Sequence, residues 1–255
     1  QCAHVTVRKE VRDLTRDEWS RYVSAVKKMN SGPRPTIFDR FTQRHLQLQR
    51  EVHGTPHFFP WHRVFTLEYE RELQRIDPSI ALPYWDWSMD AGRPENSIVL
   101  SDQYFGGNGR GGCVRDGYFR DLHHTFPAPD CLRRDYAQGS STGAFYHPSI
   151  LGLIRSRSFD YNEFRESFEN GPHSTPHMGI GGEMAIMQSP NDPLFFMHHA
   201  FVDLQWHEWQ RISPQNFYSF NGIYNGRRVN LRSPVPGYNT IVQDTMDINR
   251  FCYRY

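Results

Sequence analysis

Two histidines in the segment 169–209 have the spacing of metal ligands. His173 and His177 are four residues apart, so on a helix their imidazoles project from one face at neighbouring turns and can bind the same ion. Pro176 lies between them and would break a helix interior. We therefore expect the helix to begin near Pro172, so that Pro176 is among the first positions, which need no hydrogen-bond donor.

A third imidazole is available further along the same segment. The turn-forming run Ser189–Pro193 predicts that another helix begins after it. That helix carries two consecutive histidines, His198 and His199, and either could complete a site of three imidazoles with the first pair. The helical periodicity does not choose between them.

A second group of histidines lies upstream. The segment Ile37–Val52 has apolar residues at steps of three and four, which predicts a helix that points His45 inward. An aromatic loop bracketed by prolines follows, and the next helix is expected to begin at position 61 or 62 and to run to 76. Because the loop can bring His53 back over His62, three histidines converge at one end of these helices.

Four further histidines show no such spacing. His57 follows His53 by four residues, but its loop does not fix a shared face, so we interpret it as a loop residue. We expect His123, His124 and His147 to be surface residues, because they fall in a region without helical periodicity.

Six inward histidines in two groups of three narrow the choice of metal. Neither group has a Cys or carboxylate spaced to join it, which disfavours structural zinc, blue copper and the iron site of two histidines and one carboxylate. The zinc-protease motif H-E-x-x-H is absent. Two adjacent all-imidazole sites favour two copper ions that cycle between Cu(I) and Cu(II), with O₂ bound between them.

The rest of the chain predicts one domain built to position these groups. The 255 residues are 38% hydrophobic, enough for a substantial core. A capping box at Thr15–Glu18 predicts a helix that ends near Met29. We assign the aromatic cluster Pro83–Trp87 to the core, with Asp86 as the partner of its indole N–H groups. The segment 92–149, rich in Gly, Pro, Ser and Asp, is expected to be irregular.

Charge and hydropathy limit the class of partner. The net charge of +1, with both signs interspersed, provides no basic face for nucleic acid and no polybasic segment for anionic lipid. No apolar run approaches the roughly 18 residues of a membrane span. Small molecules are therefore the expected partners, for a chain that is a monomer or a weak oligomer.

The cysteines favour disulfides and secretion. Four scattered cysteines without a C-x-x-C motif allow three pairings. We prefer Cys2 with Cys252, which ties the termini together, and Cys113 with Cys131, which staples a Gly-rich loop. The chain also begins with Gln1 and not with methionine, as expected of a mature chain after removal of a signal peptide.

Several motifs together resemble the tyrosinase and catechol oxidase (polyphenol oxidase) family of type-3 copper proteins, over nearly the whole chain. They are VRKEVRDLTRDEWSRY, HGTPHFFPWHRVFTLEYE, PYWDW, GPHSTPH, GGEM, SPNDPLFFMHHAFVDLQWHEW and the final Tyr-x-Tyr, in the family's order. The resemblance implies that His45, His53 and His62 bind the first copper and that His173, His177 and His199 bind the second. The choice of His199 over His198 comes from the family.

The resemblance also implies a fold and an activity. The fold is mainly α, with a central four-helix bundle that holds the dinuclear copper site, long irregular loops and a few short strands. The activity is oxidation of phenols or o-diphenols to o-quinones, with reduction of O₂ to water. Glu169 matches the family's acidic residue that positions a water and helps to remove the phenolic proton. Asp203, four residues after His199, is interpreted as a hydrogen-bond partner of a ligand imidazole.

Three positions depart from many relatives. Glu51 stands where some carry a cysteine crosslinked to the following histidine. Ser174 stands where many monophenol-hydroxylating relatives carry asparagine, which favours diphenol oxidation. Met178 gives the mouth of the site an apolar wall that suits aromatic rings. The family's shielding C-terminal domain is not expected within residues 1–255, which favours an enzyme over the alternative, a haemocyanin-like oxygen carrier.

Overall fold

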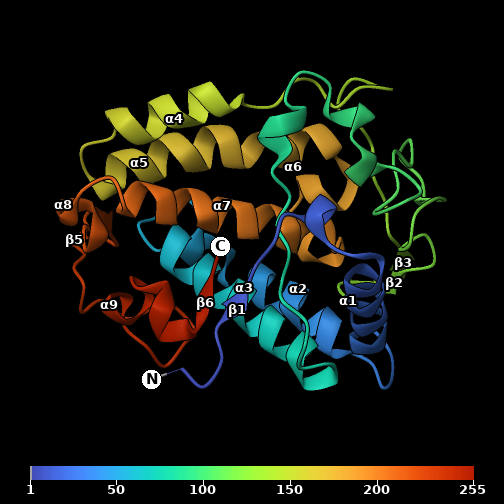
Figure 1. Cartoon of the computed structure of the whole chain (residues 1–255), viewed down its shortest axis with the longest axis horizontal. Coiled ribbons are helices and arrows are strands. Elements are labelled where there is room, and N and C mark those ends of the chain that lie inside the picture. The colour runs from blue at the N-terminus through green and yellow to red at the C-terminus, as the bar shows by residue number, and fades with distance from the viewer. Residues whose placement is uncertain (1) are drawn as a thin grey trace.

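Helices form the centre of the molecule (Figure 1). The structure is a computed structural model that describes residues 2–255, and Gln1 lies outside the described residues. The central helices are α2 (Ile37–Val52), α3 (Phe58–Ile76), α5 (Tyr161–Phe168) with α6 (Ser174–Ile180), and α7 (Leu194–Gln210). Around them lie α1 (Arg16–Met29), α4 (Pro148–Arg157), α8 (Pro214–Phe217) and α9 (Val242–Thr245). The predicted fold class, mainly α with a central four-helix bundle and a few short strands, is confirmed.

Capping boxes set the start of the first two helices. Before α1, the Thr15 hydroxyl accepts the Glu18 backbone N–H, while the Glu18 carboxylate accepts that of Thr15. Before α2, Thr36 and Asp39 make the same reciprocal pair. Both pairs satisfy N–H groups that have no partner inside the helix. The predicted bounds of α1 and α2 are confirmed.

Helix α3 begins earlier than predicted. It starts at Phe58, three or four residues before the expected start, because Pro60 is its third residue and the first turn needs no N–H donors. His62 is therefore more than one turn inside the helix, where its Nδ1 atom donates to the carbonyl of Phe58.

Helix α6 begins at Ser174, close to the expected start near Pro172, and Pro176 is its third residue as predicted, but no break in the chain's helical path precedes it. Helix α5 continues through a π turn, Glu169–His173, directly into α6. Pro172 has no N–H to donate, and the wider π turn lets the chain pass it without ending the helix. His173 thus closes the π turn, and the helix after the Ser189–Pro193 run begins at Leu194 as predicted.

The aromatic cluster Pro83–Trp87 packs in the core, as predicted. The indole N–H of Trp85 donates to Asp90 and that of Trp87 donates to the Nδ1 atom of His198, both at 3.0 Å. The prediction that Asp86 accepts from these indoles is wrong, because its side chain binds Ser88 instead.

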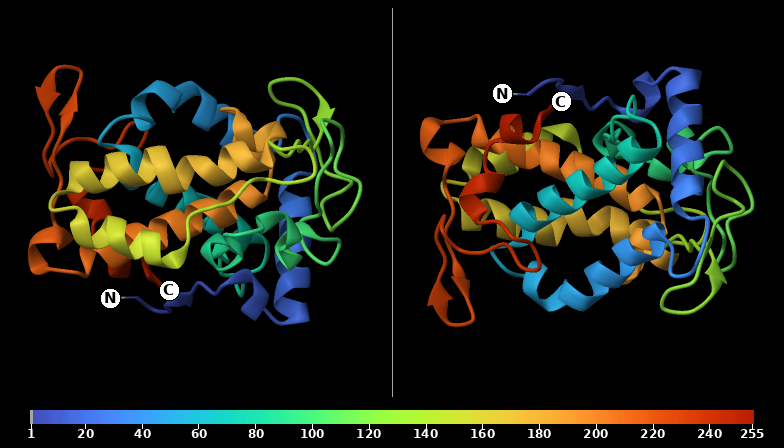
Figure 2. Two further views of the ribbon diagram at one scale, coloured as in Figure 1. Left: turned by 90° about the horizontal axis from the view of Figure 1, so that it is seen from above. Right: turned by 90° about the horizontal axis from the view of Figure 1, so that it is seen from below.

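Disulfides and short strands fasten the periphery. The strands are β1 (Thr6–Val7), β2 (His123–His124), β3 (Asp130–Cys131), β4 (Ile223–Tyr224), β5 (Arg227–Arg228) and β6 (Tyr253–Arg254). Strands β1 and β6 pair in parallel, so the first and last strands of the described chain lie side by side on one side of the molecule (Figure 2). The disulfides join Cys2 to Cys252 and Cys113 to Cys131, which confirms the predicted pairing. Among residues 2–255, no helix has the length and apolar character needed to cross a membrane.

Candidate metal centre

Two groups of histidines meet at one end of the helical bundle. In each group, one ring nitrogen per residue lies within 4.8 Å of the others, close enough to share an ion. The first group is His45, His53 and His62, from α2, its C-cap and α3, and the second is His173, His177, His198 and His199, from the π turn, α6 and α7. The rings of His62 and His199 stack at 4.4 Å between centroids, so the two groups lie face to face.

Three of these histidines are oriented by their own helical segment. Each has its Nδ1 atom within hydrogen-bond distance of the carbonyl four residues earlier. The pairs are His53 with Gln49 at 3.0 Å, His62 with Phe58 at 2.7 Å and His173 with Glu169 at 3.0 Å. A carbonyl can only accept, so Nδ1 carries the proton and the lone pair of a neutral ring is on Nε2.

Two others are oriented by carbonyls of residues 184–187, outside their own helices. The Nδ1 atom of His45 donates to the carbonyl of Met187, and that of His177 donates to the carbonyl of Met184, both at 2.7 Å. The same logic leaves their lone pairs on Nε2. One histidine of each group therefore depends on the backbone between residues 184 and 187.

The structure separates the two consecutive histidines of α7. His198 uses both nitrogens, because Nδ1 accepts from Trp87 and Nε2 donates to the carbonyl of His173, each at 3.0 Å. The Nε2 atom of His199 lies 3.4 Å from that of His177. Two imidazole nitrogens bound to one ion at about 2.0 Å with tetrahedral angles would be about 3.3 Å apart. The geometry favours His199 as the third nitrogen.

The donor set fits copper. In the part of the chain that the structure describes, the Nε2 atoms of His45, His62 and His173 are buried and have no hydrogen-bond partner. A buried polar atom without a partner is costly, and one metal ion in each group would satisfy all three. Both groups lack a coordinating carboxylate or thiolate. Purely imidazole ligands suit an ion that cycles between Cu(I) and Cu(II).

Burial keeps these imidazoles neutral. It lowers the pKa of each histidine in both groups, and neighbouring imidazoles lower the pKa of His45, His62, His173 and His199 further. Since only a neutral imidazole can donate its lone pair to a metal, the site is ready to bind an ion at neutral pH.

The copper-free protein is expected to lose stability as the pH falls from 7 to 4. An imidazole in the unfolded chain titrates near 6.5. Burial lowers the pKa of His177 in the folded chain to about 4, so between these values the unfolded chain binds more protons and acid favours unfolding. For His177 alone this amounts to roughly 3 kcal/mol.

Melting temperatures of the copper-free protein, recorded by circular dichroism across this pH range, measure the effect. Replacing His177 with glutamine is expected to flatten the slope, since an amide does not titrate. A melting temperature that stays constant down to pH 4.5 in the unmodified protein would contradict neutral buried imidazoles.

Glu169 connects the two groups of histidines. Its carboxylate accepts the backbone N–H of Gly54 at 2.6 Å and a guanidinium N–H of Arg165 at 3.1 Å. Gly54 follows His53, while the backbone carbonyl of Glu169 accepts from His173. Burial raises the pKa of Glu169, although the two hydrogen bonds lower it in part. A buried carboxylate between the groups is thus available to accept a proton.

Ser174 is turned away from this carboxylate. Its hydroxyl donates to the backbone carbonyl of Glu169 at 2.8 Å. A serine has one O–H to donate, so this bond leaves none for a water beside the Glu169 carboxylate.

A cavity of about 140 Å³ opens beside both groups. Its lining is His45, His53, His173, Ser174, His177, Met178, Met184, Ala185, Ile186, Met187 and Ser189, with no Asp, Glu, Lys or Arg among these described residues. Met178 and Ile186 are exposed at its rim, as expected for an apolar mouth. A cavity of roughly 150 Å³ holds a benzene ring, so this one matches a small uncharged aromatic molecule.

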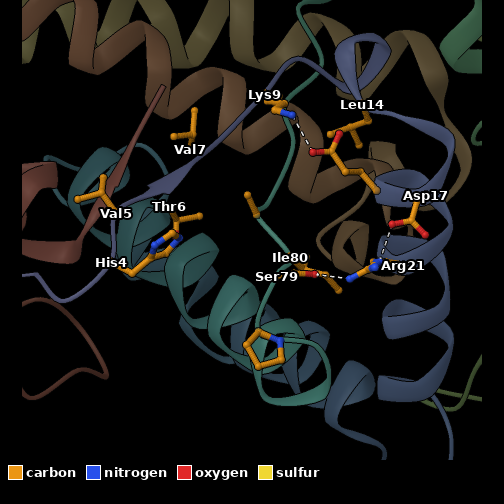
Figure 3. Close-up of a pocket in the computed structure, with 13 residues that line it drawn as sticks. His4, Val5, Thr6, Val7, Lys9, Leu14, Asp17, Arg21, Ser79 and Ile80 are labelled. Atoms are coloured by element: carbon orange, nitrogen blue, oxygen red, sulfur yellow. Dashed lines mark hydrogen bonds and ion pairs between the residues drawn. The ribbon is translucent and has the colours of Figure 1, made fainter.

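A larger hollow lies away from the histidine groups. Figure 3 shows it between the N-terminal strand and α1, bordered by the Lys9–Glu18 and Asp17–Arg21 ion pairs. Its volume is about 380 Å³, and His4 is the one histidine among the described residues that line it. The cavity beside the two groups is therefore the one that matters for metal chemistry.

Asp203 does not bind a ligand imidazole, so that prediction is wrong. Its carboxylate accepts from Arg63, Tyr253 and Tyr255, each at 2.6 Å, and the Nδ1 atom of His199 has no partner among the described residues. On α7, Asp203 is one turn beyond His199, and Arg63 comes from α3. Asp203 therefore positions the ligands indirectly, by fastening two of their helices together.

The remaining histidines differ from one another in burial. His123 and His147 are exposed as predicted, but His124 is buried at 5% exposure and its Nε2 atom lies 3.2 Å from the Glu183 carboxylate. Sequence reasoning missed this pair, because its two members are far apart in the chain and show no periodicity. His57 occupies the N-cap position of α3, where its side chain makes no cap hydrogen bond, and it belongs to neither group.

Comparison with known proteins agrees with this geometry. The family model of the common central domain of tyrosinase matches residues 35–212. A tyrosinase from Streptomyces glaucescens is 36% identical over 240 residues, which cover 84% of this chain and 86% of the relative. A tyrosinase from Streptomyces antibioticus is also 36% identical, over 241 residues that cover 84% of this chain and 86% of that relative.

Solved structures show the same fold. A variant of polyphenol oxidase from Thermothelomyces thermophila superimposes with a TM-score of 0.84 at 25% identity, over 98% of this chain and 88% of that one. A functional unit of octopus haemocyanin, at 20% identity and a TM-score of 0.71, shares the fold over 98% of this chain and 68% of its own. The chain therefore belongs to the tyrosinase family of type-3 copper proteins and is an oxidoreductase of the polyphenol oxidase type.

Proposed function

We propose that the chain oxidises o-diphenols, and less efficiently monophenols, to o-quinones with reduction of O₂ to water. His45, His53 and His62 hold one copper, and His173, His177 and His199 hold the other. The observation that carries the proposal is the pair of imidazole groups that face one another with buried, unpartnered Nε2 atoms. When bound, the two copper ions supply O₂ binding and the two-electron oxidation.

The residues of the chain supply binding, orientation and proton transfer. The apolar rim admits a small phenolic ring, and the uncharged lining gives a charged substituent no partner. Glu169 is the proposed catalytic residue, as acceptor of the phenolic proton. Its raised pKa supports this role, as do the bond from its carboxylate to Gly54, beside His53, and the bond from its backbone carbonyl to His173.

The preference for diphenols depends on Ser174. Because its hydroxyl donates to the backbone carbonyl of Glu169, it has no O–H left to donate to a water at the carboxylate. Deprotonation of a monophenol depends more on an organised proton acceptor than does oxidation of the more acidic o-diphenol. A weaker monophenolase activity is the consequence.

Initial rates of oxygen uptake with 4-methylphenol and 4-methylcatechol test this proposal. We expect faster, lag-free uptake with the catechol and a lag with the phenol. Ser174→Asn is expected to raise the rate with the phenol by several-fold to about tenfold and to leave the catechol rate nearly unchanged. The matched control is Ser156→Asn, at an exposed serine of α4. Equal, lag-free rates on both substrates would contradict the role given to Ser174.

An oxygen carrier is the alternative function. The likeness to haemocyanin supports a shared fold, whereas the relatives at 36% identity are tyrosinases. Quinone formation from 4-methylcatechol in air distinguishes the two functions. Reversible O₂ binding without quinone would favour the carrier.

The proposal also covers the domain organisation of the chain, its secretion and its oligomeric state. The main hydrophobic core is one cluster of contacting residues, and its members come from all parts of the chain between Val11 and Met246. This supports a single catalytic domain over residues 1–255. The two disulfides support secretion into an oxidising environment. The chain acts as a monomer or weak oligomer on small phenolic substrates and O₂.

A further inference from the structure

The segment Glu183–Met187, here the mouth segment, contacts both histidine groups through its backbone. The carbonyl of Met184 accepts from His177, and the carbonyl of Met187 accepts from His45, both at 2.7 Å. No other segment of residues 2–255 orients one histidine of each group in this way, since His53, His62 and His173 use carbonyls of their own helical segments. Whatever holds the mouth segment therefore sets the orientation of two ligands, one in each group.

The mouth segment is held from outside the bundle. The backbone N–H of Glu183 donates to the carbonyl of Arg133 at 3.1 Å. Gly181 and Gly182 lie so close to residues 133–135 that a Cβ atom on either would come within 2.2 Å of a carbonyl oxygen. The Glu183 carboxylate lies 3.2 Å from the Nε2 atom of His124. Both side chains are buried, at 6% and 5% exposure.

His124 belongs to a rigid part of the periphery. Its strand β2 pairs with β3, which the Cys113–Cys131 disulfide fastens. The following residue, Thr125, donates to Asp39 through both its backbone N–H and its hydroxyl, at 2.8 and 2.6 Å. Asp39 caps α2, the helix that carries His45. Strand β2 and the residue after it therefore connect the mouth segment to the start of α2, the helix that carries His45.

We propose that the buried His124–Glu183 pair is a positioning element for the copper site, which fixes the mouth segment so that the carbonyls of Met184 and Met187 hold His177 and His45 for their metals. Neither residue touches substrate or metal. The inference rests on the proposed function only in naming His45 and His177 as copper ligands. The hydrogen bonds themselves belong to the protein without metal.

Removal of the pair should act selectively. In Glu183→Ala or His124→Ala, the mouth segment keeps its backbone bonds but loses its side-chain anchor, and the remaining buried partner is left unsatisfied. The three ligands bound to their own helical segments should not respond. Glu183→Gln keeps an oxygen that can accept the His124 Nε2–H, so it should restore most of the wild-type behaviour.

Nuclear magnetic resonance of the copper-free protein tests this directly, through solvent exchange of the imidazole Nδ1–H protons. In Glu183→Ala and His124→Ala we expect exchange at least about tenfold faster at His45 and His177, with little change at His53, His62 and His173. Glu183→Gln and the control His123→Ala, at the exposed neighbour, should resemble the wild type. Equal acceleration at all five histidines, or none, would overturn the proposal.

Copper retention gives a second readout. After copper loading, a competing chelator should remove metal about 10- to 100-fold faster from both alanine variants than from the wild type, because residues that orient ligands affect metal affinity to that extent. Glu183→Gln should retain copper nearly as well as the wild type. If the exchange pattern is as expected but copper retention is unchanged, the positioning role at the metal is wrong. If the wild type binds no copper pair, the proposed function fails independently of the exchange result.

Discussion

Replacement of His53 by alanine is expected to lower the copper content of the reconstituted protein from two ions per chain to one and to reduce catechol oxidation by more than about 100-fold. His53 contributes one of the three nitrogens of the first group, and its Nδ1 atom is oriented by the carbonyl of Gln49. Two remaining imidazoles are a poor copper site, whereas the second group is untouched. Metal analysis and oxygen uptake measure the two effects.

The fold should survive this substitution. His53 is the C-cap residue of α2, and its ring lines the cavity. Its side chain hydrogen bonds to the carbonyl of Gln49 in the last turn of the same helix. Far-ultraviolet circular dichroism is therefore expected to be unchanged. His147→Ala, at an exposed histidine before α4, is the matched control and should keep both copper ions. Full activity of His53→Ala would contradict the assignment of the first copper site.

Replacement of Asp203 by asparagine is expected to lower the free energy of unfolding more than any of the other substitutions proposed above. The Asp203 carboxylate of α7 is buried at 3% exposure beside Arg63 of α3, which has no exposure, so their ion pair joins the two helices. Burial raises the pKa of Asp203, but Arg63, Arg8 and the hydroxyls of Tyr253 and Tyr255 lower it below its ordinary value, so the group is charged. Asparagine leaves the Arg63 charge buried without its counterion.

The expected cost is about 3–5 kcal/mol, or roughly a 10 °C fall in melting temperature. Chemical denaturation and calorimetry of the copper-free protein measure it without interference from metal binding. Asp17→Asn is the control, because Asp17 pairs with Arg21 at an exposed position of α1 and should contribute less than about 1 kcal/mol. A loss below 1 kcal/mol for Asp203→Asn would show that the network does not fasten the two helices.

Local signals in the sequence predict most of the helical frame. The capping box at Thr15 and the apolar periodicity of Ile37–Val52 each act within a few residues, and α1 and α2 have the predicted bounds. Proline was the main source of error. The expected start of α3 leaves Pro60 outside the helix, and the expected start of a new helix near Pro172 does not foresee that α5 continues through it. The first turn of a helix and a π turn both tolerate a residue without an N–H.

Side-chain partners across the fold could not be predicted in the same way. Helical spacing placed Asp203 near His199, whereas its partners are Arg63 and the C-terminal tyrosines, which only the tertiary structure brings together. The choice between the consecutive histidines likewise depends on Trp87, more than a hundred residues away in the chain. The residues that could bind metal were predictable from their type and spacing, but the groups that orient them were not.

The central claim is that two groups of three imidazoles hold a pair of copper ions that binds O₂. Metal analysis of the reconstituted protein, combined with absorption spectra of its chemically reduced Cu(I) form before and after exposure to O₂, tests it most directly. We predict two copper ions per chain and a strong near-ultraviolet band that appears with O₂ and disappears when O₂ is removed. A single bound ion per chain, or two ions without any O₂-dependent band, would contradict it.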